Sequence, residues 1–188
     1  IDNKIKQNLI DNGHNEMIIN LLINRGYDEE LITALLSTGY SDEMARYNDL
    51  VNVEIGADII ESHIANGSNI FIYGDYDSDG INSTYILGDA INHIIYYTES
   101  DAQLSLKVPE RHEGYGLNKE AVKKIYDAGY SLIITVDCGI TGMEEIKYAY
   151  ELGMEVIVTD HHEPLDEIPN AVAVIDCKRK DSNYPFKS

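Results

Sequence analysis

Five short apolar runs in the second part of the chain constrain its fold more than any other feature. They occur at 69–74 (NIFIYG), 104–108 (LSLKV), 131–136 (SLIITV), 154–159 (MEVIVT) and 171–176 (AVAVID). Their apolarity is continuous rather than alternating, which is typical of strands buried on both faces of a parallel sheet. Helical patterns at 81–96, 118–128 and 142–152 would supply the crossovers between strands. The sequence therefore predicts an α/β fold.

The first 50 residues follow a different pattern, which predicts a small helical unit. Their apolar residues recur near helical spacing, and Gly26 and Gly39 interrupt them. We therefore expect an α-helical N-terminal unit at 1–50. It precedes an α/β domain at 51–188, in which helices cover both faces of a parallel sheet, as in a Rossmann fold.

Acidic residues follow four of the predicted strands, at the point where each strand ends. In an open parallel α/β sheet these ends meet at one edge, and ligands bind in the crevice outside that edge. The acids that follow the strands are Asp75, Asp77, Asp79, Asp137, Asp160 and Asp176. The sequence thus predicts an acidic edge of the sheet.

Such an edge predicts a site for divalent metal ions. If 75–79 stays extended, its three carboxylates share one side, and Gly80 then permits a tight turn into the next helix. Carboxylates within about 4–6 Å of one another oppose each other's ionisation unless a cation is present. Oxygen-rich ligation with imidazole suits Mn²⁺ or Mg²⁺, and two ions about 3.5–4 Å apart clamp the reacting oxygens of a phosphoryl centre.

Each acidic residue also has a structural interpretation. A DxDxD run is often a solvated turn or a calcium loop, although no Glu lies at the twelfth position from Asp75 or Asp77, as an EF-hand requires. Asp137 can simply cap the following helix. The adjacent His161 and His162, directly after a strand, have little packing purpose at such an edge. Together with the acids they favour the metal site.

Three motifs in these segments resemble those of a known family. GDYDSDG (74–80), ITVDCGIT (134–141) and VTDHHEP (158–164) are similar to the first three motifs of the DHH phosphoesterase superfamily, in particular of its RecJ branch of single-strand 5′→3′ exonucleases. The further segments that share the resemblance are NRGYDEELI (24–32), VPERHEGYGLN (108–118) and NAVAVIDCKRKDSNYPFK (170–187). The resemblance implies a phosphodiesterase that hydrolyses single-stranded DNA from its 5′ end in repair or recombination.

The same resemblance implies which residues hold the metal. Asp77 and Asp79 would be ligands, with Asp75 contributing or supporting. Asp137 would bridge two Mn²⁺ or Mg²⁺ ions, and His161 would bind the second of them.

Further residues would serve the substrate. By resemblance, His162 would face the scissile phosphate, and Asp160 would orient it or help to ligate metal. Arg111 would contact a substrate phosphate, although an Arg on so acidic a surface is as often part of a structural ion pair. Where relatives commonly have Asn-Pro after the last strand, this chain has Asp176-Cys177, which adds a carboxylate or replaces a turn.

The family pattern also includes parts without a counterpart in the 188 residues. A fourth motif would complete the second metal site with another aspartate, and a second domain would close the substrate cleft. The resemblance thus implies a DHH domain that is incomplete at its C-terminal end. We expect the chain by itself to be a weak or inactive nuclease that works with a complementary C-terminal region or a repair or replication protein partner.

The charge of the chain limits its partners. Its 14 basic and 33 acidic residues sum to −19, which repels nucleic-acid phosphate unless cations or a basic partner intervene. A phosphodiesterase for short oligonucleotides or cyclic dinucleotides fits this charge better than one for long strands. A non-catalytic DHH-fold scaffold in a replication or repair complex is the remaining alternative.

The remaining features suggest a cytoplasmic protein without a membrane partner. No run approaches the roughly 18–20 apolar residues of a membrane span, and the first residues lack the apolar centre of a signal peptide. Cys138 and Cys177 lack ligand spacing and are expected to be packed thiols. The basic run at 178–180 either touches a phosphate backbone or is a solvated face, and we expect the solvated face. Tyr96 and Tyr97 either stack a base or take part in core and surface packing, and we expect the packing.

Overall fold

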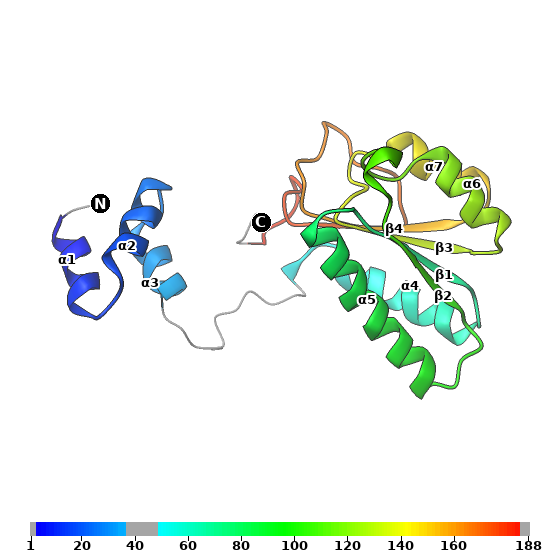
Figure 1. Cartoon of the computed structure of the whole chain (residues 1–188), viewed down its shortest axis with the longest axis horizontal. Helices are drawn as coiled ribbons and strands as arrows, with labels where there is room; N and C mark the ends of the chain where they lie inside the picture. Colours follow the sequence, from blue (N-terminus) through cyan, green and yellow to red (C-terminus); the bar gives the residue numbers. More distant parts are fainter. Residues whose placement is uncertain (1–2, 37–48, 185–188) are drawn as a thin grey trace. The chain divides into compact units, whose positions relative to one another are not determined.

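The computed structural model describes residues 3–36 and 49–184 and divides the chain into two compact units, Ile1–Met44 and Ala45–Ser188. Each unit is described by itself (Figure 1). None of the helices in the described ranges combines the length and apolarity that a bilayer crossing needs.

In its described residues, 3–36, the N-terminal unit contains three short helices around a small core. The helices are α1 (Asn3–Asp11), α2 (Glu16–Asn24) and α3 (Glu29–Leu36). Asn15 caps α2 because its side chain accepts hydrogen bonds from the N–H groups of Met17 and Ile18. Gly26, at φ +82°, follows the end of α2, as expected, whereas Gly39 lies outside the described residues. The residues buried in this core are Leu9, Ile19 and Ile32. The expected helical unit is confirmed.

The second unit contains a five-stranded sheet in which every neighbouring pair of strands is parallel. Its strands are β1 (Ile70–Tyr73), β2 (Leu104–Lys107), β3 (Leu132–Val136), β4 (Glu155–Asp160) and β5 (Ala173–Asp176). Each coincides with one of the apolar runs. The central strand β3 is buried throughout, which explains why its sequence shows no polar alternation.

Helices cover both faces of this sheet, so the predicted three-layer arrangement is confirmed. The helices are α4 (Val53–Ala65), α5 (Ser78–Tyr97), α6 (Lys119–Asp127) and α7 (Met143–Glu151), with a 3₁₀ turn η2 at Arg111–Glu113. Figure 1 shows α4 and α5 on one face and α6 and α7 on the other. Ile64 and Ile91 enter the core on the first face, and Val122 and Ile146 enter the core on the second.

Local sequence signals determine where these helices end. Gly129 follows α6 and Gly153 follows α7, at φ +83° and +84°, a left-handed conformation that favours glycine. Of the core and surface packing expected of Tyr96 and Tyr97, only the surface part is confirmed. Their rings contact each other edge to face, and both side chains are exposed at the end of α5, so the core part is wrong.

The strand order is β2-β1-β3-β4-β5, and it reverses direction next to β1. From β1 the chain crosses to β2 on one side and then returns to β3 on the other side of β1. This reversal between β1 and β3 is a topological switch point, where ligands bind in open α/β sheets. The loops after β1 and β3 carry Asp75, Asp77 and Asp137.

Candidate metal centre

The loop after β1 brings two carboxylates to the switch point. Helix α5 begins at Ser78, and the Asp77 side chain caps it by accepting hydrogen bonds from the N–H groups of Asp79 (3.0 Å) and Gly80 (3.1 Å). A Cβ atom added at Gly80 would lie 2.4 Å from the backbone oxygen of Asp75. Glycine is therefore needed because the first turn of α5 packs directly on the Asp75 backbone.

The expectation that 75–79 stays extended is therefore wrong. The backbone becomes helical at Ser78, because Asp77 caps the helix there, and Asp79 lies on its first turn with an exposed side chain. Within the described residues, two groups place their possible ligand atoms within 4.8 Å of one another. The first group is Asp75, Asp77 and Asp137; the second is Asp137, His161 and His162. Asp79 is in neither group.

The loop after β3 holds Asp137 in an unusual conformation. Asp137 has φ +59°, a left-handed geometry that only a few non-glycine residues adopt and that is common at functional sites. Its N–H donates to the carbonyl of Thr159 on β4 (3.0 Å). Asp137 does not cap the next helix, because α7 begins at Met143 after Gly142. The capping interpretation is wrong, and the carboxylate faces His161 instead.

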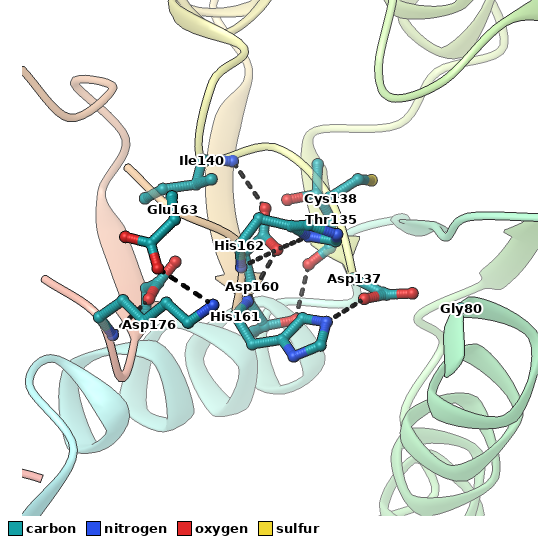
Figure 2. A network of polar contacts seen from close by, with 12 residues as sticks. Gly80, Thr135, Asp137, Cys138, Ile140, Asp160, His161, His162, Glu163 and Asp176 are labelled. Carbon is teal, nitrogen blue, oxygen red and sulfur yellow. Dashed lines mark hydrogen bonds and ion pairs between the residues drawn. The ribbon is translucent and has the colours of Figure 1, made fainter. Parts of the chain in front are cut away.

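The loop after β4 is organised by the buried carboxylate of Asp160 (Figure 2). Its Oδ1 accepts from the N–H groups of His161 (2.7 Å) and His162 (3.1 Å), and it lies 2.7 Å from His162 Nδ1. Its Oδ2 accepts from the N–H of Ile140, in the loop after β3 (2.9 Å). Asp160 thus joins two strand ends and orients the imidazole of His162.

The two histidines complete the arrangement on the side of β4. His161 Nε2 lies 3.0 Å from Asp137 Oδ1, and the rings of His161 and His162 meet edge to face with centroids 4.8 Å apart. Asp137 belongs to both groups, so its carboxylate stands where it can bridge two cations. Carboxylates from two strand ends and imidazoles from a third thus converge on one place.

Comparison with known proteins identifies the family. The DHH family, N-terminal domain, matches residues 69–184, which is more than half of the chain. The chain belongs to the DHH family. It is 41% identical over 140 residues to the single-stranded-DNA-specific exonuclease RecJ of Bacillus subtilis, and 37% identical over 146 residues to that of Escherichia coli. These alignments cover 74% and 77% of this chain but 17% and 24% of the relatives, so the chain spans about a quarter or less of their length.

Solved structures of DHH proteins share the fold. A crystal structure of exonuclease RecJ bound to manganese matches 70% of this chain and 32% of its own, with TM-score 0.62 and 33% identity. The structure of RecJ from Thermus thermophilus in complex with Mn²⁺ matches 76% of this chain and 19% of its own, with TM-score 0.60 and 29% identity. The resemblance drawn from the three motifs is confirmed.

The electrostatics of the DHH site show crowded carboxylates. Burial and the neighbouring charge of Asp77 raise the pKa of Asp137 to about 6, although His161 and His162 act in the opposite direction. The N–H of Gly80 holds the pKa of Asp77 below its usual range. Without a cation, one carboxyl of this pair therefore keeps its proton at mildly acidic pH.

Two buried oxygen atoms at this site fit a bound cation. Asp75 Oδ1 and Asp137 Oδ2 have no hydrogen-bond partner among the residues that the structure describes. Buried polar atoms are rarely left without a partner, and a metal ion would satisfy both. The donors are carboxylate oxygens and imidazole nitrogens without a thiolate, since the buried Cys138 turns its thiol to the carbonyl of Tyr73. This set suits Mn²⁺ or Mg²⁺.

The pKa of His162 reflects its bond to Asp160. Burial lowers this pKa, but the hydrogen bond and the charge of the Asp160 carboxylate outweigh burial and raise it above the usual value. Since the Asp160 carboxylate accepts a hydrogen bond from Nδ1–H, Nε2 is the ring nitrogen that stays available to a substrate.

Arg111 lies beside the loop after β1 rather than among the possible ligands. Its guanidinium group is 5.4 Å from the ring centroid of Tyr76, the residue between Asp75 and Asp77. It forms no ion pair with any other residue within 3–36 or 49–184. The structural ion pair that sequence reasoning left open is therefore absent from that part of the chain.

Asp176 ends β5, opposite Asp160 in the register of the sheet. Its side chain is buried, and its Oδ1 accepts from the N–H of Lys178 (2.7 Å), which stabilises the turn after the strand. Burial and the charge of Asp160 raise its pKa. Asp176 belongs to neither ligand group, so it serves the turn that follows the sheet.

The solvated face expected at 178–180 is wrong for its central residue. Arg179 is buried, donates to the carbonyl of Val174, and forms an ion pair with Asp181 at 2.7 Å. Burial of a guanidinium requires such partners, which are local here. Lys180 is exposed as expected.

Tyr115 is a residue of this site that sequence reasoning missed. Its hydroxyl oxygen lies 3.1 Å from His162 Nδ1, and the two rings meet edge to face with centroids 5.6 Å apart. The available signal was the pair of glycines around it, Gly114 and Gly116, because such flanks indicate a special backbone path.

Proposed function

We propose that this chain is the metal-binding core of a RecJ-type exonuclease, which hydrolyses single-stranded DNA from its 5′ end in DNA repair or recombination. The observation that carries the proposal is the pair of ligand groups joined by Asp137 at the switch point of the sheet. Supporting it, the similar proteins of Bacillus subtilis and Escherichia coli bear the name of that exonuclease.

In this proposal the members of the two ligand groups other than His162 hold Mn²⁺ or Mg²⁺. Asp75 and Asp77 would bind from the β1 side, His161 from the β4 side, and Asp137 would bridge. Asp79, exposed on the first turn of α5, would join them by rotation of its side chain. When bound, such ions supply a hydroxide nucleophile and neutralise charge on phosphate oxygens.

The chain's own residues would position the substrate. His162 would face the scissile phosphate, and because Asp160 holds its Nδ1, its Nε2 would donate a hydrogen bond or a proton to a phosphate oxygen. Arg111, exposed and without an ion-pair partner among the described residues, would bind a second phosphate. Asp160 would act through His162 and not on the substrate itself.

The charge of the chain bears on substrate length. At −19, long-range repulsion opposes a polyanion, and two divalent ions offset only about four charges. We therefore propose that the grip on a long strand needs a basic module or a repair or replication partner, in a cytoplasmic setting. The same charge favours short oligonucleotides as the second candidate substrate.

The test is hydrolysis of single strands that carry a label at either end, incubated with Mn²⁺ for long times so that slow turnover is detected. We expect Mn²⁺-dependent release from the 5′ end, abolished by His162→Ala, with metal affinity and melting temperature nearly unchanged. His93→Ala is the matched control, because His93 is exposed on α5 and should leave activity intact. Release from the 3′ end, or full activity of His162→Ala, would contradict the proposal.

A strand-length series distinguishes the substrates. A rate that rises with length supports the long-strand exonuclease. A rate that is highest on dinucleotides or cyclic dinucleotides replaces it with the second candidate. Binding of metal without any turnover, also after a complementary C-terminal region of a RecJ-type relative is added, would favour the non-catalytic scaffold role.

A further inference from the structure

The GYGLN segment at 114–118 is held firmly at both ends. Upstream, the Glu113 carboxylate accepts from Lys107 Nζ (2.6 Å) and from the N–H of Glu110 (2.8 Å). Downstream, Leu117 is buried in the core of the α6 and α7 face, and Asn118 caps α6 by accepting from the N–H of Ala121 (2.8 Å). The tyrosine between these anchors therefore has little freedom to move with its backbone.

The two glycines of this segment serve its backbone path. Gly114 has φ +91° and Gly116 has φ +77°, and a Cβ atom added at either would meet nothing within 4 Å. They are needed for their conformation and not for space. Together they direct the side chain of Tyr115 toward the carboxyl edge of the sheet, where its hydroxyl reaches residues of two other loops.

The hydrogen-bond directions around His162 follow from the donors and acceptors present. The Asp160 carboxylate can only accept, so the 2.7 Å contact requires a proton on His162 Nδ1. The Tyr115 hydroxyl donates to the carbonyl of Asp137, at 3.5 Å, and offers a lone pair to the same Nδ1–H at 3.1 Å. Tyr115 thus links His162 to the strained loop that carries Asp137.

The rings add a second constraint. The Tyr115 ring meets the His162 ring at 72°, and the His161 ring meets it at the same angle. An imidazole that is held by a hydrogen bond at one nitrogen alone can still rotate about that hydrogen bond. Here two neighbouring rings limit such motion, and only Nε2 of His162 is left without a hydrogen-bond partner among the described residues.

We propose that Tyr115 is a positioning residue for His162, which fixes the imidazole so that Nε2 meets the substrate phosphate in one orientation. That this orientation matters for catalysis rests on the proposed function. That Tyr115 restrains the imidazole ring does not depend on it. Tyr115 touches neither metal nor reacting atoms in this scheme. It acts through His162 and through the carbonyl of Asp137.

The test compares Tyr115→Phe, which removes only the hydroxyl, with Tyr150→Phe, which removes the same group from an exposed tyrosine on α7. The first measurement needs no activity: nitrogen-15 NMR of the six histidines in the full chain with Mg²⁺, with the His162 signals identified by their loss in His162→Ala. We expect a single Nδ1–H form in the unsubstituted chain. In Tyr115→Phe the His162 signals should broaden and shift, while the four histidines outside the site, at positions 14, 63, 93 and 112, stay unchanged.

The second measurement is turnover with Mn²⁺. We expect Tyr115→Phe to lower kcat by about tenfold, a fraction of what a complete acid–base group contributes, with KM and Mn²⁺ affinity within about twofold. Unchanged His162 signals in Tyr115→Phe would overturn the proposal, as would a parallel loss of melting temperature and metal affinity. Altered His162 signals in a chain without any turnover would support the positioning role by themselves, because weak or absent turnover is already expected of the chain alone.

Discussion

Replacing Asp137 by Asn should make the metal-free chain more stable at neutral pH, although it removes a central residue of the site. The folded carboxyl keeps its proton up to about pH 6, whereas an unfolded one loses it near 3.8. The folded state therefore binds more protons between these values, and the free energy of unfolding falls as the pH rises through them. Asn removes that fall, since it cannot ionise, and it tolerates the left-handed conformation of position 137.

The magnitude follows from the shift. A difference of about two pKa units corresponds to about 3 kcal/mol at pH 7.5, above both values. The lowered pKa of Asp77 changes stability only below pH 3.8, so it does not offset this gain at pH 7.5. Because the amide reproduces the contacts of the carboxyl only in part, we expect a net gain of about 1–3 kcal/mol. The gain should shrink to about 0.6 kcal/mol near pH 4, where the folded carboxyl is protonated and the unfolded one is only partly ionised.

The assay is urea unfolding in the presence of a chelator at pH 4 and 7.5, followed by tyrosine fluorescence, because the chain has 14 Tyr and no Trp. Asp58→Asn is the matched control: it removes the same charge from an exposed position on α4 and should change little. With Mn²⁺ at about 100 times its dissociation constant the unsubstituted chain should gain roughly 2.7 kcal/mol, and Asp137→Asn should gain much less. Equal stability of the two chains in chelator at pH 7.5 would refute the crowding argument.

Two further predictions concern packing around the site. Gly80→Ala should lower both the melting temperature and the Mn²⁺ affinity, by about 1–3 kcal/mol in stability, because the new Cβ would meet the Asp75 backbone. Gly129→Ala, strained but uncrowded, should lower stability alone, and calorimetry separates the two outcomes. Arg179→Ala should cost about 1–3 kcal/mol, because the Val174 carbonyl loses its buried donor, whereas Lys180→Ala should change stability by less than about 0.5 kcal/mol in the same urea titration. Equal effects of the last pair would show that 178–180 is solvated.

The sequence by itself determined the layers of this protein. A strand buried on both faces must be apolar throughout, and a crossover helix must end where glycine allows a left-handed residue, so β3 and Gly129 could be located from local pattern alone. The acids after the strands could also be assigned to one edge from the sequence, because the carboxyl ends of parallel strands all lie at the same edge of a sheet. The three motifs then indicated the DHH family.

Only the tertiary structure decided which side chains at that edge cap a helix and which lie among the possible metal ligands. Asp77 caps α5, which carries Asp79 onto a helix, and this depends on a close approach of Gly80 to the Asp75 backbone that no periodicity reveals. Arg179 is buried, although it lies between two lysines in the sequence, because the Val174 carbonyl and the Asp181 carboxylate accept its hydrogen bonds.

The contact between Tyr115 and His162 is another feature that no sequence pattern predicts, here between residues far apart in the chain. The two residues are 47 positions apart, in the segment after β2 and the loop after β4. Their distance depends on the order β2-β1-β3-β4, on the anchors at both ends of 114–118, and on the carboxylate of Asp160 that turns the imidazole. Sequence patterns report what each segment does by itself, whereas side-chain geometry between segments arises only when the sheet brings them together.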